Sequence, residues 1–160
     1  MRREGLFHVG LLLFFLAAHL ASAQPTGEPL SLAIVAPYAL IQESNLALEV
    51  TMTNHTGQPM TLVKSNPGCD FTAEVRDANG IPVPLTSSGA ELSRCRQPLV
   101  LGRWIQITLR PGESTDESYP IDLYYSLPRP GTYTVQLTRD VPSRPKHRTR
   151  SNEVVLNLAP

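Results

Sequence analysis

The sequence predicts an all-β protein, an antiparallel β-sandwich of immunoglobulin-like or fibronectin-like type with about 7–8 strands. Several short segments alternate apolar and polar residues with a period of two, which is typical of half-buried strands. Turn residues separate these segments at spacings of about 8 to 15 residues. Only 18% of the 160 residues are charged and 15 are proline, which argues against long exposed helices. A jelly roll or a small barrel remains the alternative.

The first strands are expected early in the domain. Residues 30–34 alternate leucine and isoleucine with smaller or polar side chains. The clearest alternation covers residues 46–53, where a helix would scatter the apolar side chains around its axis. Residues 54–59 have the composition of a turn, and residues 60–64 are expected to form a return strand.

A hairpin is expected next. Residues 71–76 alternate again and lead to Asn79-Gly80, a strong hairpin signal because both residues tolerate a positive φ. The second arm, residues 81–85, contains two prolines that cannot donate ladder hydrogen bonds. This arm is therefore predicted to be a sheet edge or an extended segment.

The second half of the chain supplies the remaining strands. Residues 86–102 are irregular, which predicts a long connection with limited strand content. Strands are then expected within residues 105–109, 118–124, 133–137 and 154–158, with turns at residues 110–114 and 127–131. Within the second of these strands, Tyr119, Ile121 and Leu123 are expected to face the core.

The first 23 residues are predicted to be a cleaved secretory signal peptide. Two arginines precede an apolar run of about 15 residues, and Ala21-Ser22-Ala23 is a typical cleavage triplet. The alternative is a membrane anchor, but a span needs about 20 apolar residues. We expect cleavage after Ala23, no stable membrane insertion afterwards, and one domain over residues 24–160 in the periplasm or outside the cell.

The two cysteines, Cys69 and Cys95, are predicted to form a disulfide, because an even number of cysteines in a secreted chain normally pairs. The bridge is expected to tie the connection that contains Cys95 back to the turn at residues 66–68. A redox pair or a metal site is the alternative, but the chain has neither a C-x-x-C spacing nor clustered histidines.

Few residues suggest catalysis. The predicted mature chain keeps only His55 and His147, and no motif such as G-x-S-x-G or H-E-x-x-H accompanies either one. Neighbouring acids such as Asp116 and Glu117, and also Asp122, are more typical of a solvated surface than of an acid and base pair. We therefore expect a protein that is not an enzyme and needs no metal or cofactor.

Asn54-His55-Thr56 matches the acceptor pattern for N-glycosylation. The same residues suit a turn at the end of a strand. The turn interpretation is favoured unless the protein comes from a eukaryote.

The charge is uneven along the chain, although its formal sum is zero. Five basic residues between Arg139 and Arg150 face one acid, Asp140, which gives this loop a net charge of +4. Arg144, Lys146, Arg148 and Arg150 are the expected contacts to an anionic polymer, an acidic protein face or a membrane surface. The alternative is an ordinary solvated hairpin loop. Nucleic acid is not expected, because no aromatic residue is interleaved for base stacking.

Several blocks resemble known families. The run over residues 50–62 is similar to the opening strand, turn and strand of bacterial immunoglobulin-like sandwiches. Residues 70–80, 109–113 and 130–135 resemble the intracellular proteinase inhibitor family of bacilli, and the last two blocks also resemble the non-catalytic N-terminal domain of deuterolysin-type metallopeptidases. The resemblance covers residues 45–138 and implies a sandwich fold. It assigns no inhibitory residue.

Two functions follow as expectations. The first is a secreted or periplasmic non-enzymatic binding module that uses loops or an exposed sheet edge against another protein or an anionic surface polymer. The second is a peptidase inhibitor in which residues 66–70 or 86–96, stiffened by the disulfide, enter a protease cleft.

Overall fold

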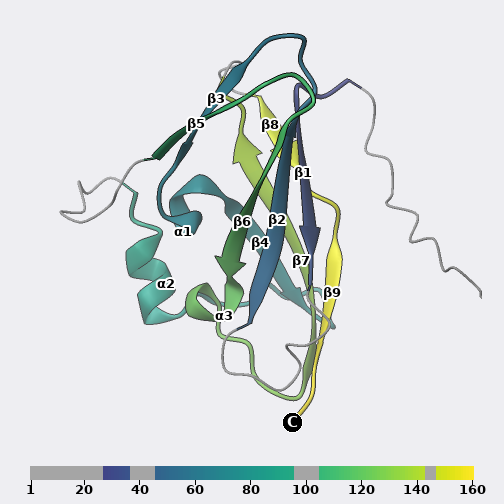
Figure 1. The fold of residues 1–160 in the computed structure, drawn as a ribbon. Helices are drawn as coiled ribbons and strands as arrows, with labels where there is room; N and C mark the ends of the chain where they lie inside the picture. Colours follow the sequence, from purple (N-terminus) through teal and green to yellow (C-terminus); the bar gives the residue numbers. More distant parts are fainter. Residues whose placement is uncertain (1–26, 37–45, 96–104, 143–146) are drawn as a thin grey trace, which may run out of the picture.

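The computed structural model describes residues 27–36, 46–95, 105–142 and 147–160 (Figure 1). The predicted signal peptide lies outside this part of the chain. All strand pairs are antiparallel, and three short sheets make up the fold. The predicted β-sandwich is therefore confirmed, with nine strands in the described residues instead of 7–8.

The three sheets have simple strand orders. Sheet A has the order β1 (Leu30–Val35), β2 (Ala47–Asn54), β6 (Ser114–Pro120). Sheet B is a ribbon of two strands, β3 (Met60–Lys64) and β5 (Ile105–Leu109). Sheet C pairs β7 (Gly131–Asp140) with β4 (Thr72–Asp77) on one side and with β8 (Arg148–Arg150) and β9 (Val154–Leu158) on the other.

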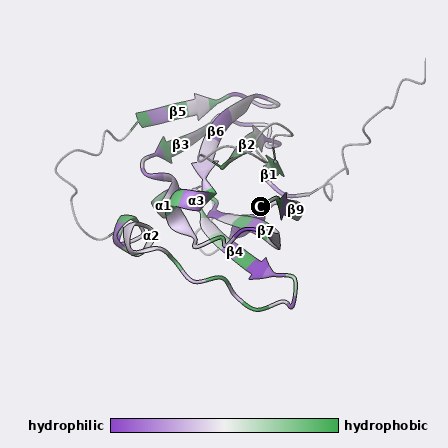
Figure 2. Cartoon of the chain, turned by 90° about the horizontal axis from the view of Figure 1, so that it is seen from below, coloured by the Kyte–Doolittle hydropathy of each residue, from purple (hydrophilic) through white to green (hydrophobic). Residues whose placement is uncertain are grey.

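Sheets A and C form the two layers of the sandwich, and the β3–β5 ribbon lies to one side of them (Figures 1 and 2). The alternation in the sequence fills the space between the layers, because every second side chain of each strand points inward. The inward side chains of β1, β2, β4 and β7 are Leu30, Leu32, Ile34, Leu48, Val50, Met52, Val75, Tyr133, Val135 and Leu137, all at most 6% exposed. They belong to a single hydrophobic cluster.

The predicted return strand is present as β3, but it does not pair with β2. The chain crosses to the ribbon after β2, and β3 pairs with β5 in the register Leu62 to Ile107. Asn54 fixes this crossing: its buried amide donates to the carbonyls of Gln58 and Leu109 at 2.8 and 3.0 Å. The buried amide thereby joins the end of β2 to the end of β5.

The hairpin after β4 confirms the turn prediction. Gly80 has a φ of +77°, and its N–H donates to the carbonyl of Asp77. The second arm forms two isolated bridges, one between Pro82 and Arg76 on β4 and one between Leu85 and Tyr125. It is thus the extended edge segment that its prolines predict.

In the second half of the chain one predicted strand is wrong in its bounds, and the connection predicted to have limited strand content contains a helix that was not expected. The strand expected over residues 118–124 begins earlier, as β6, and ends at Pro120, where the helical turn α3 (Ile121–Tyr124) replaces it. Because a helical turn breaks the period of two, Leu123 is 43% exposed and Tyr124 is buried instead. The connection after residue 86 contains the helix α2 (Ser87–Leu92), which Thr86 caps by accepting a hydrogen bond from the Gly89 N–H.

The three short helices pack around Tyr124. Its hydroxyl donates to Asn66 Oδ1 and accepts from the N–H of Gly68 in α1 (Pro67–Asp70). A Cβ on Gly68 would lie 2.3 Å from the Tyr124 ring, and a Cβ on Gly89 would lie 2.2 Å from the Tyr124 carbonyl oxygen. Both helices can approach Tyr124 this closely only because they present glycine at the contact.

Substitution of Gly89 tests this packing. We expect Gly89→Ala to destabilise the fold by about 1–3 kcal/mol, because the new methyl group meets backbone that cannot move aside easily. Gly57→Ala is the matched control, since a Cβ there has no atom within 4 Å. Urea denaturation of both variants measures the difference, and equal midpoints would contradict the packing account.

Candidate interaction site

The disulfide prediction is confirmed. Cys69 in α1 is bonded to Cys95, just after α2, with a Cα–Cα distance of 5.4 Å. The disulfide therefore ties the connection that follows β4 back to the turn that precedes β4, as the sequence predicts. Closing a loop with a sequence separation of 26 stabilises the fold by about 3–4 kcal/mol on the chain-entropy model.

The basic loop differs from its prediction at its first residue. Arg139 is only 6% exposed, because β7 continues the inward alternation of Tyr133, Val135 and Leu137 for two more residues. Arg148 is exposed but pairs with Asp140 at 2.8 Å. Arg150 is exposed on β8, whereas Arg144 and Lys146 lie outside the described residues. Arg139 is therefore no part of an exposed basic patch.

Arg139 instead links sheet C to the ribbon. Its guanidinium donates to the Val63 carbonyl on β3 at 2.6 Å and lies 5.0 Å from the centre of the Phe71 ring. Asp70 Oδ2 is 3.9 Å from Arg139 Nη1, and Asp70 itself accepts hydrogen bonds from the backbone and hydroxyl of Ser65. A cation, an aromatic ring and a carboxylate thus hold β3 against β7.

Glu117 completes this buried polar cluster from β6. It points inward beside Val50, its side chain is 9% exposed, and its Oε2 lies 3.7 Å from Lys64 Nζ. Burial raises the pKa of Glu117, and the nearby Asp70 carboxylate raises it further, while Lys64 and Arg139 act in the opposite direction. The cluster of Lys64, Asp70, Glu117 and Arg139 therefore joins β3, α1, β6 and β7 with balanced charges.

The residues considered for catalysis lie apart. His55 Nε2 is 2.7 Å from Ser31 Oγ at the surface, and Asp122 accepts from the Leu46 N–H. Asp116 faces outward, where it accepts from Thr51, while its neighbour Glu117 faces inward. Adjacent strand residues point to opposite faces, so these two acids do not form a pair. Among the described residues, no group of three or more His, Cys, Asp or Glu side chains is arranged to hold a metal ion.

Asn54 has the turn role. It is fully buried, and its Oδ1 accepts from both the N–H and the hydroxyl of Thr56. In the folded protein this amide is therefore not exposed for glycosylation.

The outer edge of β5 has no pairing strand among the described residues. In the described part of the chain β5 pairs with β3 alone, and it lies at the rim of the molecule (Figure 2). Its sequence Ile-Gln-Ile-Thr-Leu has no charge and no proline, and Ile105 is 55% exposed. Sheets usually protect such an edge with charged residues, proline or a bulge. An open, uncharged edge is a template for pairing with another strand.

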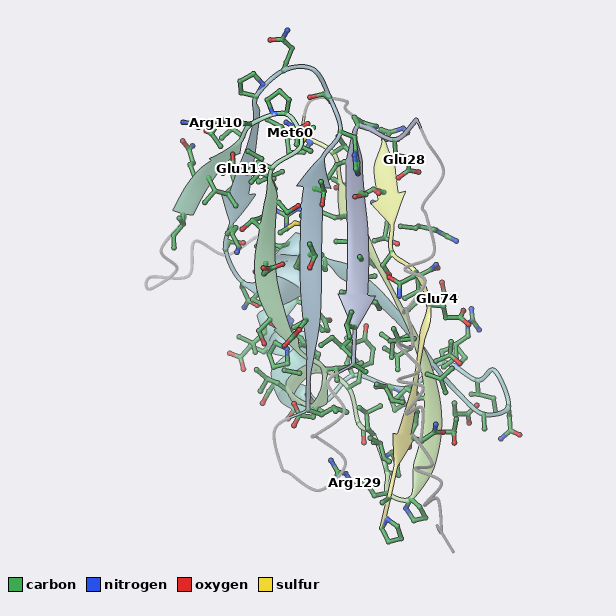
Figure 3. All side chains as sticks on the ribbon, turned by 45° about the vertical axis from the view of Figure 1, so that its right-hand side comes forward. Glu28, Met60, Glu74, Arg110, Glu113 and Arg129 are labelled. Atoms are coloured by element: carbon green, nitrogen blue, oxygen red, sulfur yellow. A yellow bond between two sulfur atoms is a disulfide. The ribbon has the colours of Figure 1, made fainter. Side chains whose placement is uncertain are left out.

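The end of the ribbon is rigid where β5 passes into β6. Gly112 has a φ of +79° and its N–H donates to the Asn54 carbonyl. The Arg110 N–H donates to the Glu113 carboxylate at 2.7 Å, and Figure 3 shows Arg110, Glu113 and Met60 at the same end of the ribbon. The turn thus fixes one end of β5, while Arg139 holds the neighbouring strand β3.

Comparison with known proteins adds no relative. No protein-family model matches the sequence, and a search of the curated proteins finds no match. The site is therefore interpreted from its own geometry.

The buried position of Arg139 yields a prediction. We expect Arg139→Ala to cost about 3–5 kcal/mol, because it leaves the buried Asp70 carboxylate without its cation and the Val63 carbonyl without the guanidinium donor. Arg148→Ala, the matched control, removes an exposed ion pair and should change stability by less than about 1 kcal/mol. Chemical denaturation compares the two, and similar losses would show that Arg139 is an ordinary surface cation.

Glu117 yields a prediction about pH. Because the pKa of Glu117 is raised in the folded state, the fold loses stability as the pH rises through that pKa. The folded state then holds an unfavourable buried charge. Glu117→Gln removes this loss, so we expect the variant to be more stable than the native protein at pH 7. The difference should shrink as the pH falls below the ordinary glutamate pKa of about 4.3, because the carboxyl then binds its proton in the folded and the unfolded state alike. A difference that stays constant or grows towards about pH 3 in urea titrations would contradict the assigned pKa direction.

Proposed function

We propose that the protein is a secreted or periplasmic, non-enzymatic binding module that accepts an extended segment of a partner protein as an added strand along β5. The observation that carries this proposal is the outer edge of Ile105–Leu109, with which no strand in the described part of the chain pairs. In an antiparallel ladder, alternate residues direct their N–H and C=O groups to opposite sides. One half of the β5 backbone groups therefore points away from β3, towards an incoming strand.

The side chains of β5 set the kind of segment that fits. Gln106 and Thr108 are exposed on the outer face, whereas Ile105, Ile107 and Leu109 share the inner face. A partner strand with apolar residues at every second position would extend this inner apolar row. Main-chain hydrogen bonds supply affinity in such complexes, and the alternate side chains supply specificity.

Two features support the proposed location. The Cys69–Cys95 bridge is typical of proteins that fold in an oxidising compartment. No helix in residues 27–36, 46–95, 105–142 or 147–160 has the length and apolar character needed to cross a membrane. Secretion through the signal peptide at residues 1–23 remains part of the proposal.

The peptidase-inhibitor alternative receives less support from the geometry. Its two proposed segments contain α1 and α2, whereas peptidases bind their substrates and substrate-like inhibitors as extended chains. A panel of purified peptidases tests this alternative directly. Stoichiometric inhibition of any of them would favour the inhibitor function over the strand-accepting one.

Strand addition is tested with a peptide that alternates valine and threonine over ten residues, carries a lysine at each end for solubility, and bears a fluorescent label. We expect saturable binding to the native protein, and at least about tenfold weaker binding to Ile105→Lys or Gln106→Lys, because a lysine guards the edge. Thr132→Lys, which adds the same charge on the central strand β7, should bind as the native protein does.

The matched control peptide is N-methylated at two consecutive residues at its centre. Because consecutive N–H groups point to opposite edges of an extended strand, one donor is removed from each edge of the peptide. It should lose binding, because N-methylation removes the N–H donors without changing the side chains. Equal binding of both peptides, or of the Ile105→Lys and Thr132→Lys variants, would contradict strand addition along β5.

A further inference from the structure

The sequence of β5 is complementary to itself in the antiparallel sense. In an antiparallel pair, facing residues lie on the same side of the sheet. If Ile107 faces Ile107 of a second copy, Ile105 faces Leu109 and Gln106 faces Thr108. Apolar side chains then meet only apolar ones on the inner face, and polar side chains meet only polar ones on the outer face.

The apolar row on this inner face is incomplete in one chain. It runs from the buried Leu109, at 3% exposure, through the half-buried Ile107 to Ile105, at 55% exposure. In the symmetric pair, the exposed Ile105 of each copy lies opposite Leu109 of the other copy, which is buried in that copy's core. Pairing therefore covers the apolar side chain that the single chain leaves in water, which favours association.

Charge does not oppose the pairing. The only charged residue of the ribbon strands is Lys64, and its Nζ points to β6, where it donates to the Asp116 carbonyl at 2.8 Å. A register shifted by one residue would place Gln106 or Thr108 of the second copy beside the apolar row on the inner face. The alternation therefore favours registers in which apolar residues face apolar ones and polar residues face polar ones. Among these registers, the one centred on Ile107 pairs all five residues of β5.

We infer that a second copy of this chain occupies the β5 edge, and that two ribbons join into a four-stranded sheet β3-β5-β5-β3 around a two-fold axis. This inference rests on the same open edge as the proposed function. A contact of two five-residue strands is small, and interfaces below about 1,200 Å² belong to weak complexes. The dimer is therefore a concentration-dependent state that a partner strand displaces.

Cysteine cross-linking tests the register. Facing Cα atoms in an antiparallel pair lie about 4.5–5.5 Å apart, which suits a disulfide, while residues one step away from the two-fold axis lie too far from their own copies. We expect Ile107→Cys to form a covalent dimer under mild oxidation and Thr108→Cys to form at least about tenfold less of it. Equal cross-linking of the two variants, or none in either, would overturn the register.

Analytical ultracentrifugation tests the association without a new thiol. The mass of the native protein should rise from monomer towards dimer between about 10 µM and 1 mM, as expected for a weak interface. Thr132→Lys should follow the native protein, whereas Ile105→Lys should stay monomeric. A native protein that is monomeric throughout, or an Ile105→Lys variant that still dimerises, would overturn the inference.

The two proposals can fail separately. Binding of the alternating peptide is measured below 10 µM protein, where the chain is monomeric. Peptide binding without self-association would overturn the inference and leave the proposed function standing. Self-association without peptide binding would do the reverse.

Discussion

The position of the β3–β5 ribbon depends on one buried guanidinium. Arg139 reaches from β7 to the Val63 carbonyl on β3 and lies over the ring of Phe71, so that one side chain joins two sheets that share no ladder. The contact continues through the aromatic rings: Phe71 meets Tyr119 edge-on at 6.2 Å, and Tyr119 stacks on Tyr124 at 5.1 Å. The ribbon, the two layers and the short helices are therefore tied into one body, which holds β5 in place at the rim of the molecule.

This arrangement places charges where water cannot solvate them well. The two cations and two carboxylates of the polar cluster balance one another, yet burial, and to a lesser extent the nearby Asp70 carboxylate, raises the pKa of Glu117. A buried ionic cluster of this kind adds little net stability, because desolvation offsets much of the attraction. Each member comes from a different element, so the cluster connects β3, α1, β6 and β7.

Much of the fold follows from alternation in the sequence, because the period of two marks which side chains face the core. The same alternation, continued from Leu137 to Arg139 and back from Tyr119 to Glu117, also identifies the buried charges. Adding up the charges of residues 139–150 grouped Arg139 with the exposed loop and did not reveal its burial. Thr86 and Asn66-Pro67 are helix-capping signals that would have located the helices after and before β4. The partner of β3 could not be predicted, since pairing between distant strands leaves no local signal. The open edge of β5 is a consequence of that pairing and became visible only with the sheets in place.

In the monomer the outer edge of β5 is expected to lack a pairing strand, and hydrogen exchange of the β5 amides measures whether it does. In dilute solution, we expect alternate β5 amides to exchange as fast as those of an unstructured chain, while the amides between them are protected by β3. Adding the alternating valine and threonine peptide should then slow the fast set. Protection of every β5 amide in the dilute monomer would show that the edge is already covered and would contradict the account.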